Sequence, residues 1–599
     1  MTFVAIAAGA LLLAAPSPPN VVLITIDTLR PDRLGSYGSS LGMSPNLDAL
    51  ASEGLRFEKA ISPVPLTRPA HASLFTGLYP PEHGVRDNLP AKLDPSIPTL
   101  TKKLSEAGYQ TAAFVGSFLL GRGSGFEIGF DVFGDGATAG AADRIGVSAE
   151  RRAAEVADEA LDYLDSARAP FFLWVHFYDP HAPYEPPSPF AGKGYSGEIA
   201  YVDSQVGRIL EAIRSRGILD STLVVATADH GEGLGDHGEE EHGVLVYEET
   251  LLVPLILRGP GIEPGSVASE PVSLIDIAPT LLATAGIAAE GESLFHPRRR
   301  ALYFESYYGN LHFGWAPLLG VREGPMKLVF APRSELFDLA SDPKEKNDLS
   351  QARKDEARRL FAELQKIGEE GAKAPRDPTA GDLEKLASLG YVGARSRAST
   401  GADPKDEIAK YSDFGRKLRE AATSFHAGDW KKAQPIFAEL ASRDILSFEV
   451  HLYLARCYRL AGNVAKAIRE YEAAAAIYDD YSVLHLELGR ALVAADELRP
   501  AVEAFEKSLA IAPSAEAERA LATAARKLGD MPRAIQALKR AVALDARDAE
   551  SWNQLGALLL SRDEVDAAIE AFEKAVALRP QDEMFRHNLD FARGIRKPQ

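Results

Sequence analysis

The sequence predicts an α/β domain with a mainly parallel sheet sandwiched by helices, followed by an all-α solenoid of helical repeats. Up to about residue 350, short runs of Val, Ile, Leu and Phe alternate with amphipathic stretches, which is typical of strands buried on both faces and helices that cover them. Beyond Gly401 the composition shifts to Ala, Leu, Glu, Lys and Arg. There a helix-pair pattern recurs about every 34 residues, which predicts stacked repeats.

Length, charge and cysteine content limit the possible functions. The chain of 599 residues is too long for one core, and its 46% hydrophobic and 25% charged residues are typical of globular domains. Its net charge of -19 argues against nucleic acid as a partner, because phosphate backbones are bound by basic surfaces. The single cysteine, Cys457, excludes a disulfide framework and a cysteine-based zinc site.

The N-terminus carries an apolar run, Val4–Ala15, followed by a proline-rich stretch. This run is too short to cross a bilayer but has the length of a signal-peptide core, so we expect residues 1–18 to be a signal peptide. The protein would then be exported to the periplasm or another extracytoplasmic space. An internal helix is the alternative, because Met1–Phe3 carries no Lys or Arg. No later segment approaches transmembrane length, so we expect no membrane span in the mature chain.

The domain at 19–350 begins with alternating strands and helices. The predicted strands are Val21–Ile26, Thr111–Val115, Phe171–Phe177, Leu223–Thr227 and Val253–Leu257. The predicted helices are Leu47–Ser52, Leu100–Glu106, Glu150–Asp165, Tyr201–Ser215 and Leu274–Ala285. From Glu305 to Leu349 the strands become shorter, which indicates a small second sheet. Residues 351–405 read as a helical segment and a linker.

Residues 406–599 contain the repeats. Turn pairs such as Gly428-Asp429, Gly462-Asn463 and Gly529-Asp530 are each followed by a helix that begins Ala-Ile or a similar pair. The period and the Pro513 and Pro580 exits match tetratricopeptide repeats. We expect about five helix pairs with a concave face that binds a protein partner, although a purely structural appendage is the alternative.

Acidic residues and a histidine follow two of the predicted strands. Asp27 ends the first strand, and Asp229 and His230 come just after the Leu223–Thr227 strand. The carboxyl ends of neighbouring parallel strands meet at one edge of a sheet, where ligands bind. With a hydroxyl from Thr67, these residues form a four-ligand set for a divalent ion such as Zn, Mn or Ca.

Thr67 is the candidate nucleophile. It precedes Pro69, which is favoured in the first turn of a helix, and helix N-termini favour anions. A metal-activated hydroxyl at such a site predicts phosphoryl or sulfuryl transfer. The alternative for Thr67 alone is a cap that merely starts a helix.

Four motifs resemble the sulfatase family, which belongs to the alkaline phosphatase superfamily. They are Pro45–Leu50, Thr67–Gly77, Thr227–Gly231 and the stretch from Tyr247 to Leu255, and Glu335–Leu339 is similar to the closing subdomain of sulfatases. The resemblance covers about residues 20 to 350. It implies an alkaline phosphatase/sulfatase-like fold with metal ligands at Asp27, Asp229 and His230 and a nucleophile at Thr67.

The resemblance also implies further site residues. His71 takes the place of an Arg near the nucleophile, and Ser117 and His242 take places where many sulfatases have Lys. Asn88 and His181 match positions that contact the substrate or the leaving group, and His181 is the first candidate for protonating the leaving oxygen. His237 lies in the same loop as His242, and its role stays open; each lone histidine could also be structural. If two zinc ions bind, Asp179, His181, His237 and His242 are candidate extra ligands.

Departures from the family shift the predicted substrate. Sulfatases oxidise a Cys or Ser at position 67 to formylglycine, but threonine cannot form that aldehyde because its Cβ carries a methyl group. Thr28 replaces a second metal-binding Asp. Thr nucleophiles are typical of phosphodiesterases, phosphonate-ester hydrolases and phosphoethanolamine transferases of the superfamily. We therefore expect a metal-dependent hydrolase of small anionic phosphate diesters or phosphonate esters. A sulfatase without formylglycine, a transferase and a catalytically silent repeat scaffold are the alternatives.

Overall fold

The computed structural model describes residues 18–88, 92–136, 150–371, 401–443, 447–477, 479 and 481–595. All but the last residue of the expected signal peptide at 1–18, and most of the linker before residue 401, therefore lie outside the described residues. The chain forms two compact units. The first, or catalytic unit, comprises Met1–Lys385 and Ser396–Ser412, and the second, or repeat unit, comprises Leu386–Arg395 and Asp413–Gln599. Among the described helices, none combines the length and apolarity that a bilayer crossing requires.

A nine-stranded sheet organises the catalytic unit, with the strand order β4-β3-β5-β1-β6-β7-β2-β8 and β9 beside β2. Strands β4, β3, β5, β1 and β6 run parallel, whereas β7 is antiparallel to both of its neighbours. The prediction of a mainly parallel sheet is confirmed. The strands are β1 Asn20–Ile26, β2 Leu55–Ile61, β3 Gln110–Val115, β4 Val132–Gly134, β5 Phe171–Phe177, β6 Thr222–Ala228, β7 Leu252–Arg258, β8 Ser266–Ala268 and β9 Val272–Ser273.

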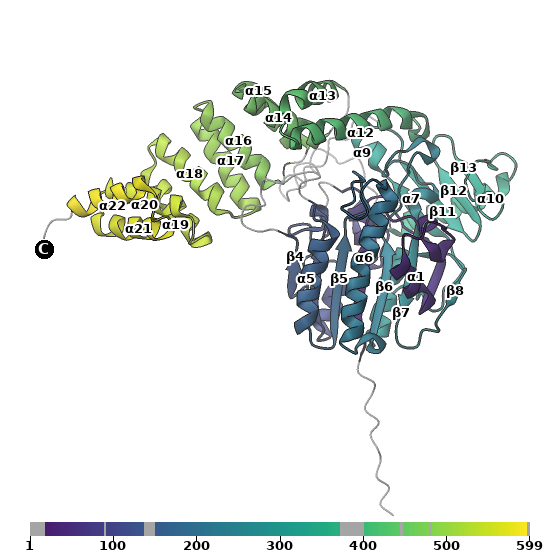
Figure 1. Ribbon diagram of the computed structural model, residues 1–599. Coiled ribbons are helices and arrows are strands. Elements are labelled where there is room, and N and C mark those ends of the chain that lie inside the picture. Colours follow the sequence, from purple (N-terminus) through teal and green to yellow (C-terminus); the bar gives the residue numbers. More distant parts are fainter. Residues whose placement is uncertain are drawn as a thin grey trace, which may run out of the picture. The chain divides into compact units, whose positions relative to one another are not determined.

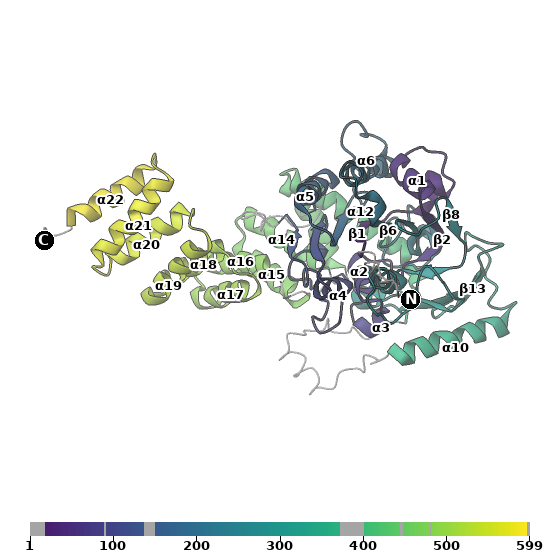
Figure 2. The same ribbon diagram turned by 90° about the horizontal axis from the view of Figure 1, so that it is seen from below.

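Helices cover both faces of this sheet (Figures 1 and 2). One layer holds α1 (Pro45–Ser52), α5 (Ala153–Ser166) and α6 (Gly194–Ser215). The other layer holds α2 (Thr67–Thr76), α4 (Leu100–Glu106) and α8 (Ile277–Thr284), while α3 (Pro80–His83), α7 (Glu248–Leu251) and α9 (Tyr308–Phe313) are short. Every residue of β1, β5 and β6 is buried, which explains why their sequences are continuous apolar runs.

Four of the five predicted helices begin elsewhere than the sequence predicts, and α1 and α8 differ by only two or three residues, since they start at Pro45 and Ile277 instead of Leu47 and Leu274. α5 starts at Ala153 instead of Glu150, because the Asp179 carboxylate accepts a hydrogen bond from the Ala153 N–H (N···O 2.7 Å) and fixes the first turn there. α6 starts at Gly194 instead of Tyr201. Its early turns are rich in glycine, and a Cβ on Gly197 would lie 2.7 Å from the Phe190 carbonyl oxygen. This close approach requires a residue of low helix propensity, which hides the helix in the sequence.

A second, antiparallel sheet closes the catalytic unit, as predicted. Its strands are β10 Leu302–Ser306, β11 Leu318–Glu323, β12 Met326–Phe330 and β13 Glu335–Asp338, and α10 (Lys354–Gly371) packs on it. Buried Lys327 on β12 joins Glu248 of α7 (Nζ···O 3.1 Å) and Glu345 (2.8 Å). This ion-pair group fixes the small sheet to the segment that connects β6 and β7.

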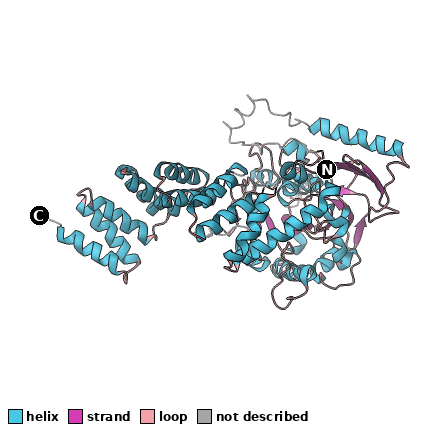
Figure 3. Ribbon diagram, turned by 90° about the horizontal axis from the view of Figure 1, so that it is seen from above, coloured by secondary structure: helices cyan, strands magenta, loops and turns pink. Residues whose placement is uncertain are grey.

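The repeat unit is all helical in its described part (Figure 3). Consecutive helices pack as antiparallel pairs, which confirms the tetratricopeptide pattern. α12 (Pro404–His426) starts in the catalytic unit, since the chain up to Ser412 belongs there. The helices that follow are α13 Trp430–Ser442, α14 Phe448–Leu460, α15 Val464–Ile477, α16 Ser482–Ala494, α17 Leu498–Ile511, α18 Ala515–Leu528, α19 Met531–Leu544, α20 Ala549–Leu560, α21 Val565–Leu578 and α22 Glu583–Ile595.

A substitution at Gly489 in α16 tests how tightly the repeats pack. A Cβ on Gly489 would lie 2.5 Å from Cε1 of Phe505, the aromatic residue of the next helix. We expect Gly489→Ala to lower the free energy of unfolding by about 1–3 kcal/mol through overpacking, measured by urea unfolding of the full chain. The matched control is Gly415→Ala in α12, where a Cβ meets no atom within 4 Å and alanine should add about 0.5–1 kcal/mol. If both substitutions stabilised the protein equally, the predicted close contact between Gly489 and Phe505 would be wrong.

Candidate active site

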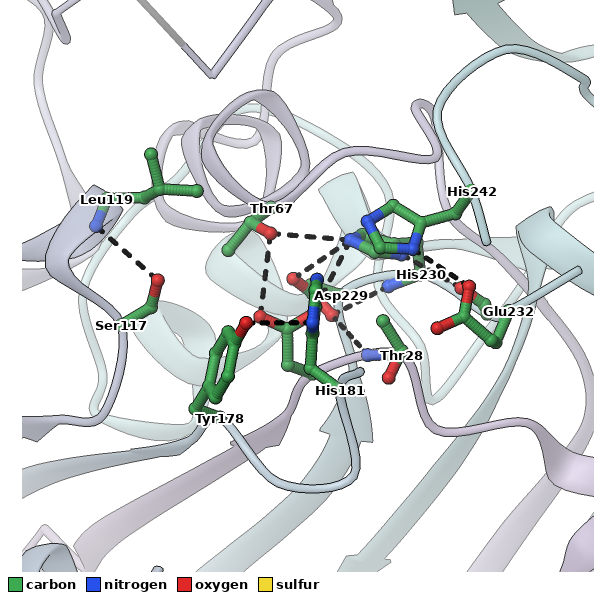
Figure 4. Close-up of polar contacts among 12 residues, drawn as sticks. Thr28, Thr67, Ser117, Leu119, Tyr178, His181, Asp229, His230, Glu232 and His242 are labelled. Carbon is green, nitrogen blue, oxygen red and sulfur yellow. Dashed lines mark hydrogen bonds and ion pairs between the residues drawn. The ribbon is translucent and has the colours of Figure 1, made fainter. Parts of the chain in front are cut away.

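Two strand ends bring three polar side chains together (Figure 4). Asp27 follows β1, and Asp229 and His230 follow β6; β1 and β6 are adjacent, with Ile26 paired to Ala228. His230 Nε2 lies 3.6 Å from Asp27 Oδ1 and 3.5 Å from Asp229 Oδ2, and all three residues are fully buried. The parallel register therefore assembles the cluster that the sequence predicts at this edge. We call Asp27, Asp229 and His230 the three-residue cluster.

The three-residue cluster fits a divalent cation. Asp27 Oδ1 and Asp229 Oδ2 are buried without a hydrogen-bond partner among the described residues. His230 donates its Nδ1–H to the Gly231 carbonyl (2.9 Å), so its Nε2 carries a lone pair. Burial raises the pKa of Asp27 well above its ordinary value, and the neighbouring Asp229 carboxylate adds to this shift. Burial also raises the pKa of Asp229, to about 6. Ligand atoms that share an ion at about 2.1 Å lie roughly 3–4.2 Å apart, as His230 Nε2 does from Asp27 Oδ1 and from Asp229 Oδ2.

Thr67 is the first residue of α2 and faces this cluster. Its Oγ1 lies 3.4 Å from His230 Nε2 and 3.5 Å from Asp27 Oδ2, and it is buried. The amide groups at the start of α2 are less available than the sequence predicts. The Arg68 N–H donates to Asn88 Oδ1 (2.9 Å), and Pro69 has no N–H. Asn88 therefore caps α2 from a distant loop.

His71 holds the first turn of α2 in place. Its Nδ1–H donates to the Thr67 carbonyl oxygen (2.8 Å), and its Nε2 contacts the Thr25 hydroxyl (3.1 Å). Burial lowers the pKa of His71, so the ring is neutral. Both nitrogens are thus used inside the protein. His71 positions Thr67 and presents no free group to a substrate.

His181 and His242 line the opening beside His230. The ring centroids of His230 and His242 are 4.3 Å apart, and those of His181 and His242 are 5.1 Å apart. His181 donates its Nδ1–H to the Ala182 carbonyl (2.8 Å), and His242 Nδ1 is bonded to Glu232 Oε1 (2.9 Å). Burial lowers the pKa of each histidine to about 3. In this state both rings are neutral at pH 7, and each Nε2 accepts a proton instead of donating one.

Ser117 and His237 are not brought into the three-residue cluster. Ser117 donates to Glu150 Oε1 (3.2 Å), and Figure 4 shows it apart from the cluster. His237 Nδ1 bonds to Glu249 (2.5 Å) and its ring stacks on Tyr247 at 3.9 Å. Although burial opposes charge, the bond to Glu249 raises the pKa of His237. Through these contacts His237 stabilises the segment that connects β6 and β7.

The four candidate extra ligands of a two-zinc site differ in their contacts. Asp179, a candidate from the sequence, pairs with Arg152 (2.7 Å) and caps α5, and His237 is bound to Glu249. Only His181 and His242 keep a nitrogen that faces the site.

Thr28, which stands where sulfatases have a second acidic ligand, adopts a strained backbone. Its φ is 55°, a left-handed conformation that is uncommon for a β-branched residue. In this conformation the Thr28 N–H points to Asp229 Oδ1 (3.3 Å). The strain therefore orients a carboxylate of the three-residue cluster.

Four further residues of the site escaped the sequence analysis. Glu150, which the sequence assigns to a helix, turns toward Ser117 and the Phe118 N–H (2.9 Å). Tyr178 follows β5, and its hydroxyl is hydrogen-bonded to His181 Nδ1 (2.8 Å). Glu232 is hydrogen-bonded to His242. His176, near the end of β5, lies 3.8 Å from Asp27. Tyr178, Glu232 and His176 have one sequence signal, their place within a few residues of a strand end, whereas Glu150 precedes α5 and lies near no described strand end.

Glu150 gives the site a pH-dependent stability. Burial raises the pKa of Glu150 to about 8 from an ordinary 4.5. Between pH 4.5 and pH 8 the folded protein holds a proton on Glu150 that the unfolded chain releases. The stabilisation that this proton provides is complete below about pH 4.5 and is lost as the pH rises through 8.

We expect the Tm of Glu150→Gln minus the Tm of the wild type to increase from about pH 5 to pH 9, because only the wild type loses this stabilisation. Glu106→Gln, on the exposed side of α4, is the matched control, and a parallel Tm curve for both variants would contradict the assignment.

Comparison with known families agrees with this geometry. The sulfatase family matches residues 19–287, and the C-terminal region of N-sulphoglucosamine sulphohydrolase matches residues 235–370. Tetratricopeptide repeats match residues 419–482, 484–549 and 519–583. The two sulfatase matches span the large sheet and the small closing sheet. They bear out the resemblance that the motifs indicate.

Individual relatives match the same part of the chain. Choline-sulfatase of Rhizobium meliloti is 28% identical and covers 56% of this chain and 82% of its own length. Arylsulfatase of Clostridium perfringens is 27% identical and covers 55% of this chain and 90% of its own. The structure of BT4656 in complex with its substrate D-glucosamine-2-N,6-O-disulfate superposes with a TM-score of 0.51, 20% identity and coverage of 60% and 99%, which supports the fold alone. Residues 19–370 thus form a sulfatase-like ester-hydrolase domain, and C-terminal tetratricopeptide repeats follow it in the same chain.

Proposed function

We propose that this protein is a metal-dependent hydrolase in which Thr67 attacks the central atom of a small anionic ester. The observation that carries the proposal is the place of Thr67 Oγ1, 3.4 Å from His230 Nε2 and 3.5 Å from Asp27 Oδ2. A divalent ion held by Asp27, Asp229 and His230 would lower the pKa of the Thr67 hydroxyl and offset the negative charge of the ester. Zn, Mn and Ca are the candidate ions.

Phosphate diesters or phosphonate esters are the substrates that this site favours. Threonine cannot be converted to formylglycine, so attack has to come from the hydroxyl itself, as in phosphorus-transferring enzymes of the superfamily. At three positions where sulfatases have Arg or Lys, this chain has His71, Ser117 and His242, and none of them carries a charge in the structure described above. A site with few cations suits a monoanionic ester better than a dianionic phosphate monoester.

The neutral imidazoles at the opening have a role in proton transfer. His181 and His242 each keep their Nδ1–H in an internal hydrogen bond, so Nε2 is the atom that meets the substrate. Either ring can accept a proton from the water that releases the product from Thr67, and an alcohol in place of water would make the enzyme a transferase. Protonation of the leaving oxygen by His181 requires the bound anion to raise the pKa of that ring from about 3.

A sulfate ester is the second candidate substrate, because the relatives described above are named as sulfatases. The repeats are proposed to bind a protein partner, as tetratricopeptide repeats generally provide a binding surface. Export of the protein stays a prediction from the apolar run near the N-terminus.

An activity panel on the purified full-length protein tests the proposal. The substrates are the 4-nitrophenyl esters of sulfate, phosphate, phenylphosphonate and a bis-(4-nitrophenyl) phosphodiester, each measured with and without a chelator. We expect the highest kcat/KM for the diester or the phosphonate and a loss of activity on chelation. Thr67→Ala should lower kcat by at least about 10³-fold, because it removes the nucleophile. Mass spectrometry of acid-quenched reactions should find the adduct on Thr67.

The matched control is Thr67→Ser, which keeps the hydroxyl and should retain activity that Thr67→Ala loses. A higher kcat/KM for the sulfate ester would identify the protein as a sulfatase without formylglycine. Absence of turnover on every ester, with metal bound, would leave the repeat scaffold as the function. Transfer to an added alcohol in place of hydrolysis would identify a transferase.

A further inference from the structure

A buried polar network lies directly below the three-residue cluster. Thr25 on β1 is paired in register with His176 on β5, and the Trp174 indole lies on the same face of β5. The Thr25 hydroxyl contacts three rings: Trp174 Nε1 at 3.0 Å, His71 Nε2 at 3.1 Å and His176 Nδ1 at 3.1 Å. His71 and His176 are both fully buried. The hydroxyl of Thr25 therefore decides where the protons of both imidazoles lie.

The donors and acceptors of these four groups determine where the protons of His71 and His176 lie. A threonine hydroxyl has one proton to donate and two lone pairs to accept with, and an indole N–H only donates. His71 uses its N–H on the Thr67 carbonyl, so its Nε2 must accept the Thr25 proton. The Thr25 oxygen then accepts from Trp174 and from His176, which places the His176 proton on Nδ1. The second nitrogen of His176, Nε2, consequently carries a lone pair.

That lone pair faces the three-residue cluster without a partner. His176 Nε2 has no hydrogen-bond partner among the described residues, and it lies 3.8 Å from Asp27 Oδ2. Two buried acceptors at this distance repel each other unless a cation or a proton lies between them. Atoms that share one ion at about 2.1 Å are separated by up to roughly 4.2 Å, so 3.8 Å lets Asp27 and His176 contact the same ion. The group whose ligand atoms all lie within 4.8 Å of one another comprises Asp27, Asp229 and His230, so His176 would join it from the Asp27 side.

We propose that His176 is an additional metal-binding residue of this site, which approaches the ion from the Asp27 side. This inference rests on the proposed metal centre and extends its ligand set. The chain lacks the second acidic ligand, since Thr28 occupies that place and turns its N–H to Asp229. His176 would supply a neutral nitrogen donor in its stead. A set of two carboxylates and two imidazoles favours Zn²⁺, Co²⁺ or Mn²⁺ over Ca²⁺, which prefers oxygen ligands.

Cobalt binding to the full-length protein tests the assignment. In paramagnetic proton NMR of the Co²⁺ form, each histidine that binds through Nε2 contributes a strongly shifted, exchangeable Nδ1–H signal. We expect two such signals in the wild type, from His230 and His176, and one in His176→Gln. Competition with a chelator should show that His176→Gln binds Co²⁺ and Zn²⁺ at least about 10–100-fold more weakly, the range found when even an outer-shell partner is removed.

Two further variants exclude a folding artefact. His83→Gln is the matched control, because His83 is also a buried histidine but bonds to Ser73 Oγ (2.9 Å) and the Val85 N–H, away from the cluster. It should keep both signals and the wild-type affinity. Thr25→Val keeps the His176 ring but removes the acceptor of its Nδ1–H, so it should weaken metal binding while the unfolding transition of the metal-free protein persists.

The outcomes separate this inference from the proposed function. A single shifted signal in the wild type, with equal metal affinity in His176→Gln and His83→Gln, would overturn the assignment of His176 and leave the three-residue cluster intact. Failure of the wild-type protein to bind Co²⁺ or Zn²⁺ would overturn both the metal centre and the role of His176.

Discussion

The site depends on the burial of two carboxylates at the ends of adjacent parallel strands. Asp27 and Asp229 are excluded from water, and each keeps an oxygen without a partner among the described residues. Isolated charges in such a place are costly, so the surrounding structure has to supply positive charge or a proton. No lysine or arginine is among the described contacts of these two carboxylate groups, whose neighbours are imidazoles and hydroxyls. A bound cation is the arrangement that satisfies this chemistry.

The same constraint explains why the histidines around the site have their protons on Nδ1. His71, His181 and His230 each donate that proton to a backbone carbonyl, and His242 bonds to a carboxylate. Backbone carbonyls only accept, so they determine the tautomer without any catalytic event. Each ring then turns Nε2 away from its anchor. Nitrogen lone pairs thus gather at the carboxyl ends of β1, β5 and β6, where a metal and an electrophilic ester would both be bound.

Strand-end reasoning could predict Asp27, Asp229, His230 and the sheet that positions them, because register follows from adjacent parallel strands. Thr67 could be placed at a helix start from Pro69. Glu150 and His176 could not be found, since Glu150 lies outside the helix to which the sequence assigns it and His176 lies within an apolar strand, one residue before its end. The contacts of Ser117 and His237 depend on Glu150 and Glu249, which are distant in sequence or hidden by a turn. Side-chain direction within a loop is set by such tertiary partners, and residue type alone does not reveal it.

The fold determines the charge of the histidines that line the site. The β6–β7 connection, which the small sheet fixes through Lys327 and Glu248, carries both His230 and His242. Holding these rings neutral near pH 7 requires their burial, and burial requires that connection to remain closed over them. A neutral ring cannot neutralise a second negative charge on a substrate, whereas it can take a proton from an attacking hydroxyl. Under the proposed function, the burial that lowers the pKa of these histidines would therefore also favour esters with a single negative charge.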